Sequence, residues 1–266
     1  MLKLLGIPYD ENSSFMQGPS QAPGLIRQMD TDGSANPYAE DGQLIKKDKS
    51  YQDLGDIDLN GLNPEQAYVK TKAIVEEQLD KQHKIISLGG DHSVSFPILE
   101  MYAKQYTGLN VLHFDAHADI YDNFQDNPFS HASPFARLME TQSIAKLTQV
   151  GIRTLDSHQR EQIKIFDVDV IEMKDFNFEF INKLKGPLYI SIDLDGLDPA
   201  FAPGVSHHEP GGLSTRELIR CIQDIQVPIV GADIVEYNPK RDINNMTAMV
   251  AYKLFKELAA KILDSN

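Results

Sequence analysis

Three metal-binding side chains stand at alternate positions in the stretch LHFDAHADIYD (residues 112–122), namely Asp115, His117 and Asp119. The apolar run from Val111 to Phe114 leads directly into them. Carboxylates and imidazoles are common ligands of divalent cations, and a strand that ends on such a cluster holds it rigidly. The spacing therefore favours a metal site over a solvated surface turn.

Other apolar runs in the chain also end on polar clusters. IISL leads to Gly89, Gly90, Asp91, His92 and Ser93, LYISI leads to Asp193 and Asp195, and PIVGADIV leads to Glu236. In open α/β sheets, ligands bind at the carboxyl ends of parallel strands. We therefore expect these clusters to converge with the first one in a single site.

The elements that would position the clusters alternate between short β-type runs and helical stretches. This alternation predicts one α/β domain over residues 1–266, with a mostly parallel sheet flanked by helices. Expected strands cover 3–7, 84–88, 110–114, 148–152, 188–192 and 228–234. Expected helices cover 64–82, 214–225 and 244–263, and residues 30–50 are expected to form a surface loop.

Convergence has an electrostatic consequence for Asp115, Asp119, Asp193 and Asp195. Two like charges about 4 Å apart repel by about 4 kcal/mol at an effective dielectric constant of 20, so these carboxylates require cations among them. Two divalent ions would balance four carboxylates. Oxygen and imidazole ligands without a thiolate suit Mn²⁺, and they leave zinc, iron and cobalt open.

Two histidines and one further carboxylate complete this cluster. His92 and His117 would add neutral imidazoles to the metal ligands. We expect Asp91 to orient one of the ligand histidines through a hydrogen bond.

Charge and cysteine content narrow the class of protein. The formal net charge of −14 argues against nucleic acid or an anionic membrane as partner. The negative charge either favours a cationic substrate or only keeps the protein soluble. Cys221 is the only cysteine, so an internal disulfide is excluded and a reducing compartment is favoured. The first apolar run is too short for a signal peptide, and no stretch reaches the roughly 18 apolar residues of a membrane span. A cytoplasmic protein is expected.

The motifs GGDHS, DAHAD, SHASPF, SIDLDGLDPAFAPG, EPGGLS and ADIVEYNP resemble the signatures of ureohydrolases. This family contains arginases, agmatinases, guanidinobutyrases and formiminoglutamases, and the chain is most similar to agmatinases. With GIPYDENSSFMQGP near the start, the resemblance covers nearly the whole chain. It implies a three-layer α/β/α sandwich with a mainly parallel central sheet.

The resemblance also implies a binuclear manganese centre. One ion would be held by His92, Asp115, Asp119 and Asp193, and the other by Asp115, His117, Asp193 and Asp195. Two ions about 3.5 to 4 Å apart lower the pKa of a shared water, which would attack a guanidinium carbon and release urea and an amine. Asp119 would orient that water, Glu236 would bind the guanidinium group, and His131 would protonate the departing amine.

Substrate choice depends on the residues beyond Asp119. Arginine-specific members usually carry Asn two positions later, where this chain has Tyr121, and no Lys or Arg lies between Ile120 and Ala136. The resemblance therefore points to agmatine, which would yield putrescine and urea in polyamine metabolism. Guanidinobutyrate, arginine, formiminoglutamate and guanidine remain alternatives.

His207 and His208 depart from the agmatinase pattern. They are candidate substrate-binding residues that would reshape the mouth of the pocket, bind an acidic tail or have no role.

Two other classes of protein stay open. A zinc-dependent deacetylase of related fold would bind one metal, whereas a catalytically silent protein would bind metal without releasing urea. The resemblance further implies a homo-oligomer, either a trimer or a hexamer, acting on a small cationic guanidino substrate.

Overall fold

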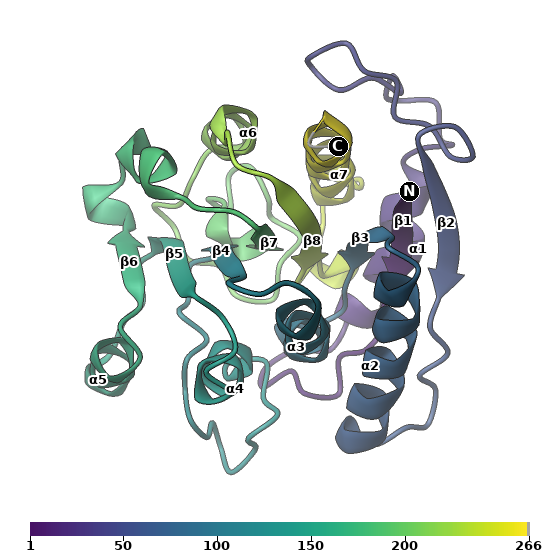
Figure 1. Ribbon diagram of the computed structural model, residues 1–266. Coiled ribbons are helices and arrows are strands. Elements are labelled where there is room, and N and C mark those ends of the chain that lie inside the picture. Colours follow the sequence, from purple (N-terminus) through teal and green to yellow (C-terminus); the bar gives the residue numbers. More distant parts are fainter. Residues whose placement is uncertain (265–266) are drawn as a thin grey trace.

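The computed structural model describes residues 1–264 and is built around one sheet of eight parallel strands (Figure 1). The strands are β1 (Leu2–Gly6), β2 (Tyr51–Asp56), β3 (Lys84–Leu88), β4 (Asn110–Phe114), β5 (Lys146–Ile152), β6 (Asp169–Glu172), β7 (Leu188–Asp193) and β8 (Ile229–Val235). Their order across the sheet is β2-β1-β3-β8-β7-β4-β5-β6, and every neighbouring pair is parallel.

Helices cover both faces of the sheet and make two separate hydrophobic cores. One face packs against α1 (Ala22–Gln28), α6 (Thr215–Asp224) and α7 (Met246–Asp264). The other face packs against α2 (Pro64–Asp80), α3 (Ser95–Gln105), α4 (Pro134–Glu140) and α5 (Ser157–Ile165). Figure 1 looks along the sheet with one helix layer above and one below, which confirms the predicted three-layer α/β/α sandwich.

The six predicted strands all occur, within two residues of the expected bounds. The prediction missed β2 and β6, which are the two edge strands. An edge strand pairs on one side only, so it tolerates charged and glycine residues that make its sequence look like a loop. YQDLGD of β2 and the four-residue DVIE of β6 have this character.

The predicted starts of α2 and α6 agree with the structure because their capping residues are explicit in the sequence, whereas α7 begins at Met246, two residues after its predicted start. Asn63 and Gln66 form a capping box at the start of α2, and Ser214 and Glu217 form one at α6. The helices α1, α3, α4 and α5 were not predicted, although Asp156 provides α5 with the same kind of cap.

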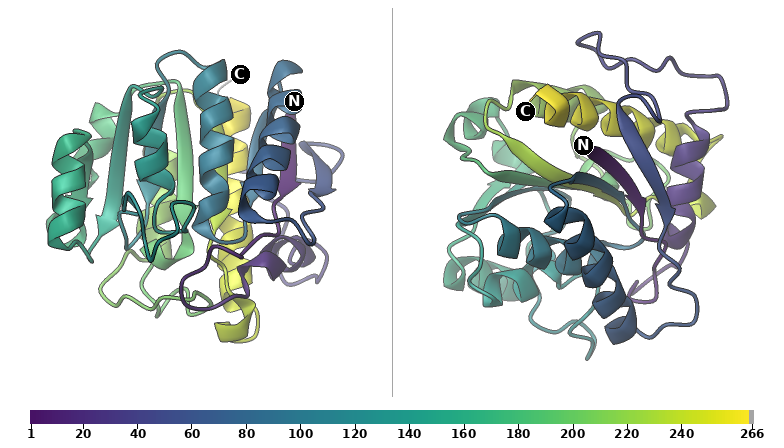
Figure 2. Two further views of the ribbon diagram at one scale, coloured as in Figure 1. Left: turned by 90° about the horizontal axis from the view of Figure 1, so that it is seen from below. Right: turned by 45° about the vertical axis from the view of Figure 1, so that its right-hand side comes forward.

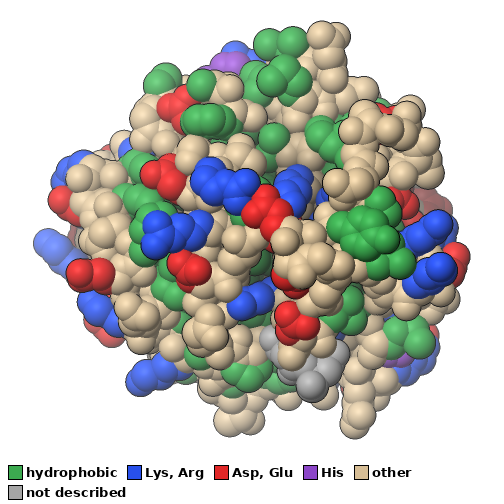
Figure 3. Space-filling view, turned by 90° about the horizontal axis from the view of Figure 1, so that it is seen from above, with side chains coloured by type: hydrophobic (Ala, Val, Ile, Leu, Met, Phe, Trp, Pro, Cys, Tyr) green, Lys and Arg blue, Asp and Glu red, His purple; other side chains and the backbone are tan. Residues whose placement is uncertain are grey.

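Residues 30–50, the predicted surface loop, contain no helix and no named strand. Glu40 in this segment pairs with Arg216 on α6. On the side of the molecule that carries α6 and α7, Lys and Arg side chains lie among Asp and Glu side chains (Figure 3). None of the helices in residues 1–264 is both long and apolar enough to cross a membrane.

Candidate metal centre and active site

The predicted site residues follow four strands that are neighbours in the sheet, in the order β3-β8-β7-β4. His92 comes shortly after β3, Asp115 directly after β4, and Glu236 directly after β8, while Asp193 is the last residue of β7. Because the strands are parallel, their carboxyl ends share one edge of the sheet, and the loops that follow them gather there (Figure 2). The expected convergence is therefore present.

The first ligand group surrounds the ring of His92. Its Nδ1 atom lies 3.0 Å from Oδ2 of Asp119. The same nitrogen lies 3.2 Å from Oδ2 of Asp115 and 3.3 Å from Oδ2 of Asp193. All four residues are buried, so these four ligand atoms make a compact cage.

The second group surrounds the ring of His117. Its Nδ1 atom lies 3.0 Å from Oδ2 of Asp195 and 3.4 Å from Oδ1 of Asp115. Asp115 thus offers one oxygen to each group. Asp193 is expected to do the same; its Oδ2 faces His92, and its Oδ1 accepts a hydrogen bond of 2.8 Å from the backbone N–H of Asp195, just as Oδ1 of Asp115 accepts one from the backbone N–H of His117.

The donor atoms and the electrostatics of these two ligand groups fit divalent cations. Nδ1 of His92 is fully buried and has no hydrogen-bond partner within the described part of the chain, although three carboxylate oxygens face it. Burial and the neighbouring Asp195 and Asp115 carboxylates raise the pKa of Asp193 well above its usual value. Burial likewise raises the pKa of Asp195 to about 6. Divalent ions would remove this strain, and the oxygen and imidazole donors suit them.

A buried chain of hydrogen bonds fixes the orientation of the His92 ring through its Nε2 atom. Its Nε2 atom lies 3.0 Å from Oγ of Ser191, which donates to Asp233 at 2.6 Å. Tyr189 donates to the other oxygen of Asp233 at 2.9 Å. This arrangement leaves Nδ1 of His92 free to face the carboxylates.

The predicted role of Asp91 was wrong, because Ser191 takes it. The Asp91 carboxylate instead accepts hydrogen bonds from the backbone N–H groups of Asn12 and Ser93. It therefore holds the N-terminal segment against the loop after β3.

His113 was not predicted as a site residue, yet it fixes Asp115. Its Nε2 atom lies 2.8 Å from Oδ2 of Asp115, and its Nδ1 atom lies 3.1 Å from Nε2 of Gln149. The amide nitrogen of Gln149 can only donate, so Nδ1 of His113 accepts and Nε2 carries the proton toward Asp115. A neutral imidazole thus donates to the carboxylate that both ligand groups share.

Glu236 and His131 lie beside the ligand groups and contact each other. Oε1 of Glu236 accepts from the backbone N–H of His92 at 2.9 Å and from Nδ1 of His131 at 2.8 Å. Both side chains are buried. Although burial opposes it, the charge of Glu236 raises the pKa of His131 to about 9.

Asp119 and Glu236 both have left-handed backbone conformations, with φ of 46° and 63°. Non-glycine residues rarely adopt these angles, which cost free energy and tend to occur at functional sites. Both side chains are aimed into the same cavity by this unusual backbone.

A cavity of about 240 Å³ opens over these residues. Its lining includes the predicted residues Tyr121 and His207, together with Glu209 and Gln159, which the sequence reasoning missed. His208 does not line it. Its ring nitrogens contact the backbone oxygen of Pro203 and the guanidinium of Arg241, so this side chain braces the loop.

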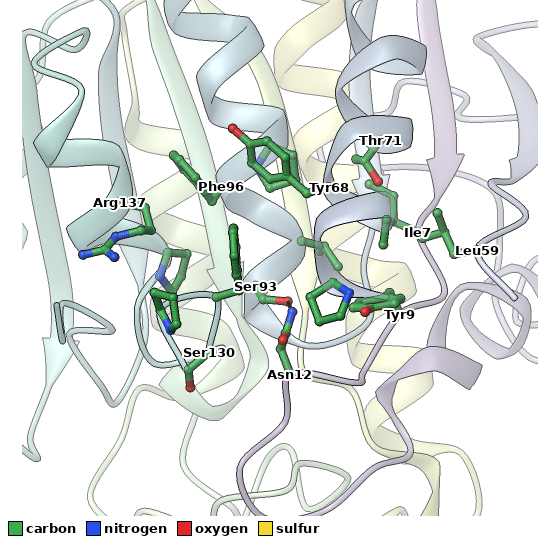
Figure 4. Close-up of a pocket in the computed structure, with 17 residues that line it drawn as sticks. Ile7, Tyr9, Asn12, Leu59, Tyr68, Thr71, Ser93, Phe96, Ser130 and Arg137 are labelled. Carbon is green, nitrogen blue, oxygen red and sulfur yellow. Dashed lines mark hydrogen bonds between the residues drawn. The ribbon is translucent and has the colours of Figure 1, made fainter. Parts of the chain in front are cut away.

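Figure 4 shows a second, narrower cavity behind the loops of the site, lined by α2, α3 and residues such as Tyr9, Phe96 and Ser130. Its volume is about 30 Å³, which suffices for about one water molecule. The Tyr9 hydroxyl is buried and has no hydrogen-bond partner among residues 1–264. Of these two cavities beside the site, the one of 240 Å³ has room for a substrate.

Comparison with known proteins identifies the family of this site. The family model described as "Arginase family" matches residues 2–260. The chain belongs to the arginase family. This arginase-family chain is 45% identical to arginase 1, mitochondrial, of Arabidopsis thaliana, over 97% of the chain and 80% of that protein. It is 32% identical to the agmatinase of Bacillus subtilis, over 96% of the chain and 89% of that protein.

A solved structure agrees with this assignment. The arginase from Medicago truncatula superposes with a TM-score of 0.93 at 40% identity, covering 98% of the chain and 87% of that structure. Membership in the arginase family confirms the resemblance to ureohydrolases. The prediction of greatest similarity to agmatinases was wrong, since the Arabidopsis arginase is 45% identical and the Bacillus agmatinase 32% identical. The substrates of the arginase-family relatives differ by name, so the family alone does not fix the substrate here.

Proposed function

We propose that the protein hydrolyses an alkylguanidine to urea and an amine. The observation that carries this proposal is the position of Glu236 and His131. They contact each other beside the two ligand groups, and all of them line or adjoin one cavity with room for a small substrate. A silent metal-binding protein would not need a buried carboxylate and a buried histidine at this place.

The ligand groups are proposed to hold two Mn²⁺ ions, one bound by His92 with Asp115, Asp119 and Asp193, and the other by His117 with Asp115, Asp193 and Asp195. When bound, the ions would supply a water molecule activated for attack at neutral pH. Asp119 would accept a hydrogen bond from this water and orient it.

Glu236 would bind the guanidinium group of the substrate through a charge-assisted hydrogen bond. Its backbone conformation and its bonds to His92 and His131 hold the carboxylate in place before the substrate arrives. This preorganisation positions the guanidinium carbon for attack. His131 would give a proton to the nitrogen of the departing amine as the C–N bond breaks.

Agmatine is the substrate that the charge of the cavity favours. Glu209 lines the cavity in addition to the metal-binding carboxylates, whose charge the ions would balance, and no Lys or Arg lines it within residues 1–264. The nearby guanidinium of Arg153 is occupied by backbone oxygens, including those of Asp195 and Glu209. A distal ammonium group fits such surroundings better than the carboxylate of guanidinobutyrate or formiminoglutamate.

Arginine is the second candidate, because the Arabidopsis and Medicago relatives named above are arginases and share more sequence than the agmatinase does. Arginine differs from agmatine by one carboxylate next to its amine. Neutral donors would have to bind this group, and Gln159 lines the cavity with a side-chain amide, whereas the Thr154 hydroxyl already donates to the backbone oxygen of Ala116.

The test is urea release by the Mn²⁺-loaded protein with agmatine, arginine, 4-guanidinobutyrate and guanidine, and ammonia release from formiminoglutamate. We expect agmatine or arginine to give the highest kcat/KM and 4-guanidinobutyrate to be much poorer. Two bound metals without turnover of any of these compounds would reject the proposal. A single bound metal would favour deacetylase-like chemistry.

The protein is also proposed to act as a homo-oligomer, a trimer or hexamer, in the cytoplasm. Light scattering of the purified protein would test the first statement, since a monomer would contradict it. Fractionation of the source cells would test the second.

A further inference from the structure

The segment Asn12–Met16, which we name the strap, crosses the edge of the active site. At its first end, the backbone N–H of Asn12 donates to Asp91 at 3.1 Å, and the backbone N–H of His131 donates to the oxygen of Asn12 at 3.2 Å. Ser13 donates from its hydroxyl to Asp91 at 3.2 Å. This end of the strap is therefore tied both to the loop after β3 and to the loop that carries His131.

The other end of the strap is tied to the loops after β7 and β8. The backbone oxygen of Met16 accepts hydrogen bonds from Oγ of Ser206 at 3.3 Å and from Nδ2 of Asn238 at 3.5 Å. Because both ends are anchored, the position of Ser14 between them is fixed by the fold.

Ser14 points at His131 from the cavity side. Its hydroxyl oxygen lies 2.8 Å from Nε2 of His131, and its backbone N–H donates to the same nitrogen at 3.2 Å. Within residues 1–264, the Ser14 hydroxyl has no other hydrogen-bond partner. Ser14 is exposed and lines the cavity, whereas His131 is only 7% exposed.

These contacts determine which nitrogen of His131 carries a proton. A backbone N–H can only donate, so Nε2 accepts from Ser14 in the neutral imidazole, the form that is left once His131 has given up its proton. Nδ1 then carries the proton and donates to Glu236. In this state Nε2 is the nitrogen able to take up a proton, and the Ser14 hydroxyl stands between it and the water of the cavity.

We propose that the Ser14 hydroxyl passes protons between the water of the cavity and Nε2 of His131, and that the Ser14 N–H holds this nitrogen in place. The inference rests on the proposed function. In the relay, the O–H bond of Ser14 breaks as its proton moves to Nε2, and a proton from cavity water restores it, so Ser14 is unchanged. His131 then holds the proton that the departing amine takes up. Ser14 is thus a positioning and relay residue that acts through His131.

The chain offers a matched control for this proposal. Ser14→Ala removes the hydroxyl that faces His131 and keeps the backbone N–H. Ser13→Ala removes a hydroxyl from the adjacent residue of the same strap, one that faces Asp91. Ser14→Thr keeps a hydroxyl at the position. All three variants are compared with the wild type as full-length, Mn²⁺-loaded proteins of measured metal content.

We expect Ser14→Ala to lower kcat by about tenfold with KM within twofold, since the relay feeds a general acid whose own contribution is larger. Ser14→Thr should recover most of the loss, and Ser13→Ala should stay close to the wild type. A kcat of Ser14→Ala within twofold of the wild type would overturn the proposal. An equal loss in both alanine variants would do so too, because packing of the strap would then be the cause.

A second measurement does not depend on turnover. In metal-free protein labelled with ¹⁵N in histidine and held at about pH 10, above the His131 pKa of about 9, the His131 signals, assigned with a His131→Asn variant, should show an unprotonated Nε2 that accepts a hydrogen bond. Ser14→Ala should shift this signal, and Ser13→Ala should not. Nε2 signals identical in wild type and Ser14→Ala would refute the contact. Absence of urea release by the wild-type protein would reject the proposed function. The NMR signals test the contact between Ser14 and His131 independently of that result.

Discussion

Asp115 is the residue on which both ligand groups depend, because its two oxygens face different histidines. Its position is set by His113, which donates to Oδ2, and by the backbone N–H of His117, which donates to Oδ1 at 2.6 Å. His92 belongs to one ligand group only, and His117 belongs to the other. Removal of one histidine should therefore affect one metal and leave the other.

His117→Ala should reduce the metal content from two ions to one per chain. Loss of a residue that only supports a metal ligand typically lowers activity by up to about 100-fold. We expect loss of the ligand His117 itself to lower turnover by more than that. Metal analysis after gel filtration, together with urea release, checks both parts. Substantial turnover with one metal would contradict the binuclear mechanism. Wild-type protein carried through the same column is the control.

At the scale of elements, β7 and β8 each supply a buried polar side chain that helps to orient His92. Ser191 on β7 and Asp233 on β8 are polar residues inside apolar strands, and their side chains meet across the pair. Burial raises the pKa of Asp233, so this carboxylate is retained at a cost in stability. We attribute its presence to the orientation of His92.

Asp233→Asn should weaken binding of the ion at His92 by roughly 10- to 100-fold. An amide can donate a hydrogen bond to Ser191, so Ser191 would no longer be obliged to accept the proton of His92. Competition with a chelating dye gives the dissociation constants. Tyr189→Phe, which removes a different bond to Asp233, is the control and should have a smaller effect. Equal affinities in Asp233→Asn and wild type would refute this role.

The features that could best be predicted from the sequence are those that depend on residues close together in the chain. The ligand clusters were visible because they interrupt apolar runs, and α2 and α6 because their caps lie within four residues of each other. Ser191 and Asp233 also interrupt apolar runs, but they lie inside strands, and their partners are set by the strand order. Ser14 could not have been found in this way, because it lies 117 positions from His131.

At the scale of the whole molecule, the buried carboxylates link stability to pH and to metal. Burial raises the pKa of Asp195 from 3.8 to about 6, so the folded protein binds this proton more tightly than the unfolded chain. The contribution of Asp195 to the free energy of unfolding of metal-free protein therefore falls as pH rises from 3.8 to about 6. Metals bind the ionised carboxylates and should reverse this trend.

We accordingly expect metal-free protein to have a melting temperature roughly 3 to 5 °C lower at pH 7 than at pH 4.5. Addition of Mn²⁺ at pH 7 should raise the melting temperature. At a concentration 100 times the dissociation constant, binding should add about 2.7 kcal/mol to the free energy of unfolding. Calorimetry at both pH values provides the measurement. Asp195→Asn should reduce the pH effect without removing it, because burial also raises the pKa of Asp193. An unchanged slope in this variant would mean that Asp195 does not contribute.

The place of β8 between β3 and β7 has a consequence for biosynthesis. A ribosome makes β3 and β7 before β8, so a chain made only as far as β7 lacks the strand that joins them in the sheet. Residues 229–235 fill this position, and Glu236 follows them directly. Assembly of the proposed site therefore requires a chain that extends through Glu236.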